Sequence, residues 1–516
     1  MTKLFKIIIL TLIVQHFGVT VQAQDKSAEI DKIFSWATKE TPGCVCAIAQ
    51  NGKVIYNRAQ GLADLERNVL LSPDSKLDAG SLVKQFVAAS TLLLVEDGKL
   101  SLSDDIRKYI PELPEYGAKI TIDQLLTHTS GIRDWTGLQM FSNGSEDSFK
   151  MMLRQRGLNF KPGEEWAYSN SNYVLLKELI ARLTGMNFSE FSTKRLFEPL
   201  GMNATRYVDD LRSVVKNRAL AYEKQQGAWT MAMYLDNDRG GGALLSTATD
   251  LLIWNAALND KKLGDAVSQK LEEPAKLNNG RQLTYARGLF NETYFGNKEV
   301  WHTGAASGYK SWLGRFPTLG LSISIMCNAG DESNGTRYAE RIVELLNGPI
   351  AKGPDPTLLT DTAGLDLTEK TGVYMNEKTG DLLRLAIEGK RFRVVGGPAL
   401  SPLKTNSFAR VGKIVSFMSG DEFKLNFIGK DQVELTTMEG KVVRYQRLQT
   451  YTPSAEEMKS FSGKFESKDL AATFEVRPEK GILMLRLTHL LNQSLEFRPI
   501  GLNRFQRGMM IIHFTR

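Results

Sequence analysis

A serine and a lysine stand three residues apart in the segment Gly80-Ser81-Leu82-Val83-Lys84. If this segment opens a helix, its i and i+3 side chains share a face, so the hydroxyl of Ser81 and the amine of Lys84 can meet. The positive end of the helix dipole favours negative charge on the serine oxygen, and a buried lysine with a lowered pKa can act as a base. The pair therefore fits a nucleophile and its base, although so short a pattern also fits an ordinary helix start.

Two later segments carry further groups of this kind. Tyr168-Ser169-Asn170 combines a phenol, which can relay a proton, with an amide that can bind a substrate. Trp301-His302-Thr303-Gly304-Ala305 ends a predicted strand, where the main chain can bind an extended substrate. One N–H of that edge, together with the N–H of Ser81, can form an oxyanion hole. Taken singly, this tyrosine and this histidine would be interpreted as structural residues.

The order of the three segments is more specific than any one of them. Ser-x-x-Lys, then Tyr-x-Asn, then His-Thr-Gly resembles the serine β-lactamase and penicillin-binding-protein family, in its class C-like branch with D-aminopeptidases and esterases. Two further stretches are similar to that branch, the segment 125–131 (LLTHTSG) and the segment 240–243 (GGGA). The resemblance covers about residues 26–345 and implies an α+β fold, an antiparallel sheet flanked by helices with a helical subdomain.

The resemblance also implies a role for each matched residue. Ser81 is then the nucleophile that forms an acyl-enzyme, and Lys84 and Tyr168 share the removal and delivery of its proton. Asn170 is expected to hold the amide carbonyl of the substrate. Ala305 is expected to supply the second N–H of the oxyanion hole.

His302 departs from the family pattern. Most β-lactamases and transpeptidases of this family carry lysine there, next to the Thr303-Gly304 that completes the substrate-binding edge. Histidine is mostly neutral at pH 7, so anion binding should be weaker and β-lactam hydrolysis is disfavoured. We expect His302→Lys to raise affinity for substrates that carry a carboxylate. A histidine at this catalytic position is similar to the D-aminopeptidase and esterase members.

The expected function is that of an exported serine hydrolase acting on an amide or ester, in particular a small peptide with D-amino acids. A carboxylesterase or weak β-lactamase is the alternative within the fold. A penicillin-binding receptor whose acyl-enzyme hardly turns over is the alternative of another class. The β-rich tail resembles the two barrel modules of bacterial D-aminopeptidase, in which a barrel loop reaches the site, and Asp469 or Glu479 is a candidate to meet a substrate amine.

Hydrophobic patterning predicts the elements that must position these groups. A helix is expected over 26–38 and another from Ser81 to Glu96, and Asn51-Gly52 predicts a hairpin turn. The middle of the chain, about 100–260, is predicted to be mainly helical and loop-like. The expected strands are 44–50, 54–61, 283–290, 299–303, 309–316 and 321–327.

A change of composition divides the chain. Glycines and prolines around 347–366 predict a linker between a hydrolase domain, 24–350, and an all-β tail with one short helix at 454–460. The tail contains an internal repeat, which predicts two barrel-like modules at 360–450 and 455–516. Phe408 and Phe505 occupy matching places in it, but far fewer residues follow Phe505. We therefore expect the second module to lack strands or the sequence to be truncated.

The first 23 residues resemble an export signal. Lys3 and Lys6 accompany the apolar stretch 4–14, which is shorter than the ~20 residues that span a bilayer, and Val21-Gln22-Ala23 offers a cleavage site. Removal of this signal peptide predicts a periplasmic or secreted bacterial protein with no integral membrane segment, while a retained anchor is the alternative. The oligomeric state is not predicted.

Composition excludes several classes of protein. The 516 residues are 42% hydrophobic and 24% charged, as in globular rather than disordered or fibrous proteins. The net charge of +7 is spread without a dense basic block, so a nucleic-acid partner is not expected, and the substrate is a small molecule or peptide. Cys44, Cys46 and Cys327 are expected to be small hydrophobic residues of a sheet core rather than a redox or metal site, and no metal or cofactor is expected.

Overall fold

The computed structural model describes residues 26–139, 141–142, 147–233, 242–294, 296–330, 333–348, 366–376, 381–388, 391–395, 400–410, 423–436, 442–449, 451–487, 494–507 and 510–515. The predicted signal peptide, residues 349–365 of the predicted linker and Gly240-Gly241 lie outside these ranges.

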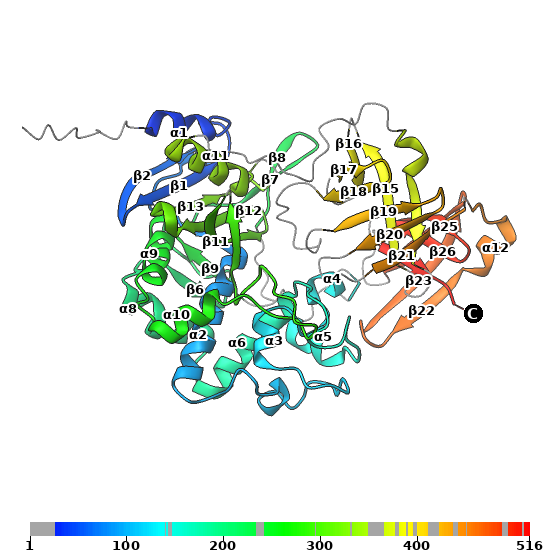
Figure 1. The fold of residues 1–516 in the computed structure, drawn as a ribbon, viewed down its shortest axis with the longest axis horizontal. Coiled ribbons are helices and arrows are strands. Elements are labelled where there is room, and N and C mark those ends of the chain that lie inside the picture. The colour runs from blue at the N-terminus through cyan, green and yellow to red at the C-terminus, as the bar shows by residue number, and fades with distance from the viewer. Residues whose placement is uncertain are drawn as a thin grey trace, which may run out of the picture.

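An antiparallel six-stranded sheet forms the centre of the N-terminal part (Figure 1). Its hairpin β1–β2 turns at Asn51-Gly52, both in the left-handed region, as predicted. The early strand β1 pairs with the late strand β13, so the sheet joins the two ends of this part of the chain. In spatial order the strands are β10 (Phe290–Tyr294), β11 (Asn297–Ala306), β12 (Tyr309–Phe316), β13 (Leu321–Cys327), β1 (Cys44–Gln50) and β2 (Lys53–Gln60).

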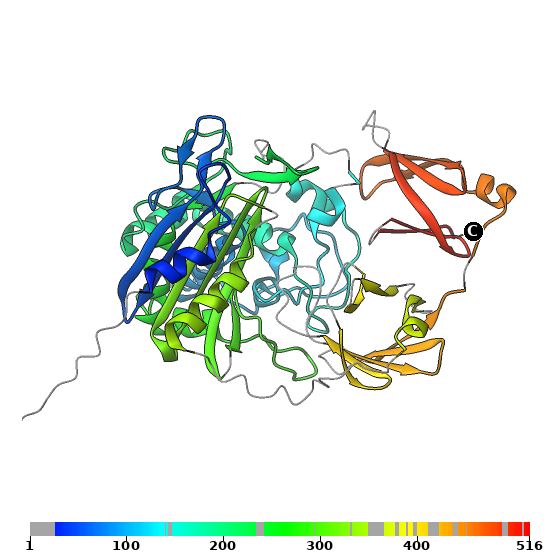
Figure 2. The same cartoon turned by 90° about the horizontal axis from the view of Figure 1, so that it is seen from above.

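Helices cover both faces of this sheet (Figures 1 and 2). Successive strand residues point to opposite faces, so β1 sends Ile48 to one side and Val45 to the other. The first side is covered by α1 (Ser27–Ile33), which is shorter than predicted, and α11 (Gly335–Asn347). The second side is covered by α2 (Val83–Glu96) and α9 (Ala248–Asn259), with α10 (Asp265–Glu272) next to α2. The fold is α+β, as predicted.

The middle of the chain is mainly helical and loop-like, as predicted, and short strands accompany it there and between residues 62 and 78. Its helices are η2 (Ile106–Lys108), α3 (Ile122–Leu126), α4 (Trp135–Gln139), α5 (Ser148–Arg154), α6 (Asn170–Thr184), α7 (Phe188–Ser192), a π-helical turn (Thr193–Phe197) and α8 (Glu198–Leu200). The small sheets are β3 (Leu62–Asp64) with β4 (Val69–Leu70), β5 (Leu77–Asp78) with β9 (Ala243–Ser246) and β6 (Arg206–Val208), and β7 (Tyr222–Gln225) with β8 (Ala228–Met231).

The predicted strand 283–290 is wrong, because strand β10 begins only at Phe290. The chain before it passes against helix α2: a Cβ added to Gly288, at φ +75°, would lie 2.7 Å from the main-chain oxygen of Lys84. The buried Arg287 anchors the same segment, donating a hydrogen bond of 2.7 Å to Asp123. A segment held by close approach to a helix does not pair as a strand, although its apolar residues resemble one.

The prediction that the cysteines are only small hydrophobic residues is also wrong for two of them. Cys44 and Cys327 form a disulfide across β1 and β13, although 283 positions separate them in sequence. The register of the two strands sets these residues opposite each other, a pairing that hydrophobic patterning does not predict. Cys46 is a buried free cysteine on the same face of β1.

Two antiparallel sheets make up the C-terminal part and lie on the side of the helical part (Figure 2). The eight-stranded sheet runs β16 (Arg391–Val394), β15 (Leu382–Glu388), β14 (Gly372–Met375), β21 (Val442–Arg447), β20 (Gln432–Thr436), β19 (Lys424–Ile428), β18 (Ser407–Arg410) and β17 (Leu400–Lys404). Its end strands β16 and β17 contact each other, so it is nearly closed. The second sheet runs β22 (Gly463–Ser467), β23 (Ala472–Glu479), β24 (Ile482–Leu487), β25 (Ser494–Gly501), β26 (Arg504–Arg507) and β27 (Met510–His513), preceded by the predicted short helix α12 (Ala455–Ser460).

The residues of the predicted repeat occupy matching places in the two sheets. Phe408 and Phe505 are both completely buried in their cores. The strand pairing shifts register just after Pro402 in one sheet and just after Pro499 in the other. Within the described residues the second sheet has six strands against eight, and β22 pairs with β23 alone.

Candidate active site

Ser81 lies in the short 3-10 helix η1 (Gly80–Leu82), between strand β5 and helix α2. Gly80 adopts a left-handed conformation, at φ +55°, and its N–H donates to the carboxylate of Asp78 at 2.8 Å. A Cβ on Gly80 would lie 2.6 Å from the main-chain nitrogen of Ala305. This close approach brings the turn that carries Ser81 next to the end of strand β11.

Lys84 reaches two of the predicted partners. Its Nζ lies 3.1 Å from Oγ of Ser81 and 2.9 Å from Oδ1 of Asn170. Burial lowers the pKa of Lys84 to about 7, while the carboxylate of Asp134 opposes this shift and the positive charge of Lys177 adds to it. About half of the amines are therefore neutral, and able to accept a proton, near pH 7.

Tyr168 is buried against the same lysine. The Nζ of Lys84 lies 4.8 Å from the centre of the phenol ring. Burial raises the pKa of Tyr168 well above its usual 10, although a hydrogen bond with Ser81 works in the other direction. The phenol of Tyr168 therefore keeps its proton at neutral pH.

Asn170 is the first residue of α6 and lies between a cation and a carboxylate. Its Oδ1 accepts from Lys84, and its Nδ2 donates to Oδ2 of Asp134 at 3.0 Å. Asp134 is a half-buried residue of the loop before α4 that the sequence motifs did not predict as part of the site. Its only signal was its place three residues after Gly131, the end of the LLTHTSG segment.

His302 is completely buried and both of its ring nitrogens are engaged. Nδ1 lies 2.6 Å from the main-chain oxygen of Thr303, which can only accept, so Nδ1 carries the proton. Nε2 then accepts from the Tyr285 hydroxyl at 3.3 Å. Burial, with the nearby charge of Lys84, lowers the pKa of His302 to about 3, so the ring is neutral. Its ring centre lies 6.1 Å from that of Tyr168.

The edge of β11 packs directly on the turn before Ser81. A Cβ on Gly304 would lie 1.9 Å from the main-chain oxygen of Ala79, and Ser311 on β12 donates a hydrogen bond of 2.7 Å to that same oxygen. The Thr303 side chain is buried, and Ala305 at the end of the strand is half-buried. The structure thus gathers the predicted residues from η1–α2, the start of α6 and the end of β11.

Of the two acidic residues proposed for the β-rich tail, one contacts the helical part and the other is exposed. The main-chain oxygen of Asp469 accepts from the Nε2 of Gln155 at 3.0 Å and from the Nε of Arg154 at 3.4 Å, at the end of α5. Glu479 is exposed at the end of β23. The carboxylate that the structure places beside Lys84 and Asn170 is that of Asp134.

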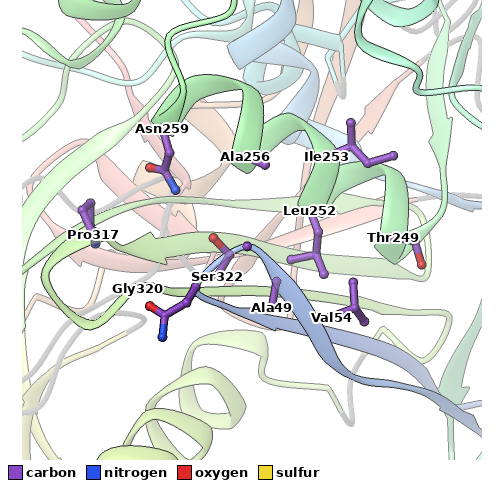
Figure 3. Close-up of a pocket in the computed structure, with 12 residues that line it drawn as sticks. Ala49, Val54, Thr249, Leu252, Ile253, Ala256, Asn259, Pro317, Gly320 and Ser322 are labelled. Atoms are coloured by element: carbon purple, nitrogen blue, oxygen red, sulfur yellow. The ribbon is translucent and has the colours of Figure 1, made fainter.

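A separate pocket of about 400 Å³ is shown in Figure 3. It lies between the β1–β2 hairpin, helix α9 and the turn before β13, where Val54, Leu252 and Ile253 line it. None of the predicted site residues lines this pocket.

Two kinds of feature are absent from the described residues. These residues contain no group of three or more His, Cys, Asp or Glu side chains arranged to hold a metal ion. None of the helices in this part of the chain has the length and apolar character needed to cross a membrane.

Comparison with known proteins places this arrangement in context. A family model described as Beta-lactamase matches residues 29–347. Penicillin-binding protein 4* of Bacillus subtilis (strain 168) is 31% identical over 326 residues, which are 57% of this chain and 69% of that protein. Among solved structures, the octameric penicillin-binding protein homologue from Pyrococcus abyssi aligns with a TM-score of 0.56 at 21% identity, over 89% of this chain and 97% of that one. The D-amino acid amidase from Ochrobactrum anthropi SV3 aligns with a TM-score of 0.52 at 26% identity, over 62% of this chain and 97% of that one.

Proposed function

The chain belongs to the beta-lactamase family of serine hydrolases, and we propose that it cleaves small peptides or amides of D-amino acids through an acyl-enzyme on Ser81. One observation carries the proposal: the Nζ of Lys84 lies 3.1 Å from Oγ of Ser81 and has a pKa of about 7. A neutral amine at this distance can take the serine proton as the oxygen attacks the substrate carbonyl.

The different pKa shifts divide the acid and base roles between two residues. Lys84 is the base, because its amine loses its proton near neutral pH. Tyr168 is the donor, because burial holds its phenol in the protonated form. The phenol gives its proton to the leaving amine and regains one from the ammonium of Lys84, so the two groups end the acylation step as they began it.

The oxyanion of the tetrahedral intermediate needs donors that are already in place. The main-chain N–H groups of Ser81 and Ala305 fit this role, since the close approach of Gly80 to Ala305 puts the two segments side by side. Losing one oxyanion-hole donor costs roughly 3–4 kcal/mol of barrier in acyl-transfer enzymes where it has been measured.

The charges around the site favour a substrate with a free amine over one with a carboxylate. His302 is neutral and buried, so it offers no fixed positive charge to a carboxylate. Asp134 instead places a half-buried carboxylate beside Asn170, where an ammonium group next to the scissile carbonyl could pair with it. The likeness to a protein that is by name a D-amino acid amidase supports the same substrate class.

A panel of chromogenic substrates tests the proposal. We expect repeated turnover of D-alanine p-nitroanilide, slower turnover of its L enantiomer and of its N-acetyl form, and none by Ser81→Ala. Turnover confined to p-nitrophenyl esters or to a chromogenic cephalosporin would instead identify an esterase or a β-lactamase. Stoichiometric labelling by penicillin without turnover of any substrate would identify a receptor.

We further propose that the protein is exported. The amino-terminal segment has the pattern of a cleaved signal, and the Cys44–Cys327 disulfide is typical of oxidising compartments. Mass spectrometry of the protein from its native host should find a mature amino terminus at Gln24 in the periplasmic or medium fraction. A chain that keeps residues 1–23, or that stays in the cytoplasm, would contradict export.

A further inference from the structure

His128 is a buried histidine next to the site to which neither the motifs nor the proposed reaction assign a role. It lies in the segment LLTHTSG, just after α3, and is completely buried. Its backbone adopts φ +59°, in the left-handed region that few residues other than glycine occupy. A histidine is therefore held here, in an unusual conformation, by contacts that its side chain and main chain make.

Those contacts go to the segment that carries the catalytic tyrosine. The main-chain oxygen of His128 accepts from the N–H of Ala167 at 3.0 Å, and its Nδ1 accepts from the N–H of Ser169 at 3.1 Å. The two hydrogen bonds bracket Tyr168 on both sides along the chain. The imidazole ring itself lies against the phenol, with ring centres 4.3 Å apart.

The hydrogen bonds also determine which nitrogen carries the proton. A main-chain N–H can only donate, so Nδ1 of His128 keeps a lone pair and the neutral ring carries its proton on Nε2. The amide of Asn172 supports this form: its Oδ1 accepts from the Ser130 hydroxyl at 2.8 Å, so its Nδ2 faces Nδ1 of His128, at 3.2 Å. Protonation of Nδ1 would break both bonds.

The surroundings keep the ring neutral over the range in which the site works. Burial lowers the pKa of His128 well below 6.5, and the positive charge of Lys84 and the nearby His302 act in the same direction. The aromatic rings of Tyr173 and Tyr285 pack around it, at 5.2 and 5.0 Å between centres. The acceptor at Nδ1 is thus available throughout the titration of Lys84.

We propose that His128 is the positioning residue of Tyr168: its Nδ1 holds the main chain of Ser169 while its ring supports the face of the phenol. The inference rests on the proposed function, in which Tyr168 is the proton donor. A phenol that is free to tilt would move its hydroxyl away from Ser81, and displacements of ~1 Å can cost about 100-fold in rate. We assign its effect to Tyr168, because its hydrogen bonds hold the residues on either side of Tyr168 and its ring faces the phenol.

Two substitutions at His128 separate the effect of the hydrogen-bond acceptor Nδ1 from the effect of the flat ring. His128→Asn keeps an acceptor oxygen near the position of Nδ1 and is a residue type that tolerates φ +59°. His128→Phe keeps a flat ring against Tyr168 but leaves the N–H of Ser169 without its acceptor. We expect His128→Phe to lower kcat on D-alanine p-nitroanilide at least about tenfold with KM within about twofold, and His128→Asn to stay within about threefold in kcat.

The rates are expressed per folded active site, counted with a fluorophosphonate label at a temperature below the melting transition of every variant. A merely structural role would lower the number of labelled sites and leave kcat per site unchanged, which would overturn the proposal. Equal loss of kcat in both variants would overturn it as well. If His128→Phe does not fold, Asn172→Ala takes its place in the test. This substitution removes one donor to Nδ1 of His128 and the contact with Ser130. The proposal then requires that Asn172→Ala lower kcat per site by a few-fold.

A double-mutant cycle with Tyr168→Phe tests the route of the effect. In the Tyr168→Phe background, which lacks the phenol hydroxyl, His128→Phe should lower kcat by less than about a further twofold. The reason is that the effects of substitutions at residues acting as a unit do not add. Additive losses would show that His128 acts independently of Tyr168. Failure of the proposed function is distinguishable, since the unmodified enzyme would then lack turnover of D-alanine p-nitroanilide altogether.

Discussion

Gly304 on strand β11 lies so close to Ala79 that a Cβ added to it would be 1.9 Å from the Ala79 main-chain oxygen. Ala79 directly precedes η1, which carries Ser81, so this contact sets the distance between Ser81, the proposed nucleophile, and the strand edge at Ala305. The proposed catalytic arrangement therefore depends on a glycine that has no side chain to take part in the reaction.

Gly304→Ala is expected to separate the two donors of the oxyanion hole. The new methyl group meets backbone rather than a flexible side chain, so either β11 or the turn at Ala79 must shift. We expect kcat/KM to fall by about 100-fold or more, the size of effect that follows loss of an oxyanion donor. Steady-state kinetics on D-alanine p-nitroanilide measure this loss.

Gly185→Ala is the matched control. Gly185 ends α6 at φ +70° with no atom within 4 Å of its added Cβ. This substitution should cost about 1 kcal/mol of stability through backbone strain and leave kcat/KM unchanged. Equal activity of the two variants would mean that the close approach at Gly304 does not position the site.

The activity should rise with pH through about 7. The pKa of Lys84 is lowered from 10.5 to about 7, so below that pH the amine is protonated and cannot accept the proton of Ser81. We expect kcat/KM to fall about tenfold for each pH unit below 6. A pH profile on an uncharged ester, which has no ionisation of its own, checks this without interference from the substrate amine. A flat profile from pH 5 to 9 would exclude Lys84 as the base.

Two charge substitutions should shift the acidic limb of the pH profile, the range in which kcat/KM falls as Lys84 becomes protonated, in opposite directions. The carboxylate of Asp134 raises the pKa of Lys84, so Asp134→Asn should shift the limb to lower pH while keeping an acceptor for Asn170. The charge of Lys177 lowers the same pKa, so Lys177→Met should shift the limb to higher pH. Shifts of the same sign in both variants would contradict the electrostatic account. Asp134→Asn should also reduce the preference for a free amine over its N-acetyl form.

The sequence predicted much of the core sheet and the contact between Ser81 and Lys84 because local patterns suffice for them. The Asn51-Gly52 hairpin and the strands over 309–316 and 321–327 follow from turn chemistry and hydrophobic runs. The spacing of Ser81 and Lys84 within one turn predicted their contact. Each of these relationships lies within a short stretch of chain, where residue type determines geometry.

Other features depend on segments that meet only in the folded chain. Asp134 joins the site because its loop folds back onto the start of α6, where Ser171 donates a hydrogen bond to the main-chain oxygen of Arg133. The segment before Phe290 has the composition of a strand, but its contact with α2 prevents strand pairing. His302 was predicted as a catalytic residue from its place in the motif, and the motif gave no sign that its ring nitrogens bond Tyr285 and the main-chain oxygen of Thr303.

The disulfide between Cys44 and Cys327 should stabilise the N-terminal part strongly. It links β1 and β13, the first and last strands of the central sheet along the chain, and closes a loop of 283 positions, so it restricts the unfolded chain more than a short loop would. Cys44→Ala with Cys327→Ala should lower the free energy of unfolding by about 3–5 kcal/mol, read from denaturant melts of the oxidised and the doubly substituted protein.

Cys46→Ala is the control for this pair, because Cys46 is buried on the same face of β1 but remains a free thiol. It removes only a sulfur atom and should cost about 1 kcal/mol. A reductant should destabilise the unmodified protein and the Cys46→Ala variant alike, and leave the doubly substituted protein unaffected. Equal stability of the unmodified and doubly substituted proteins would mean that the two thiols are not joined in solution, and the support for export from an oxidising compartment would be lost with them.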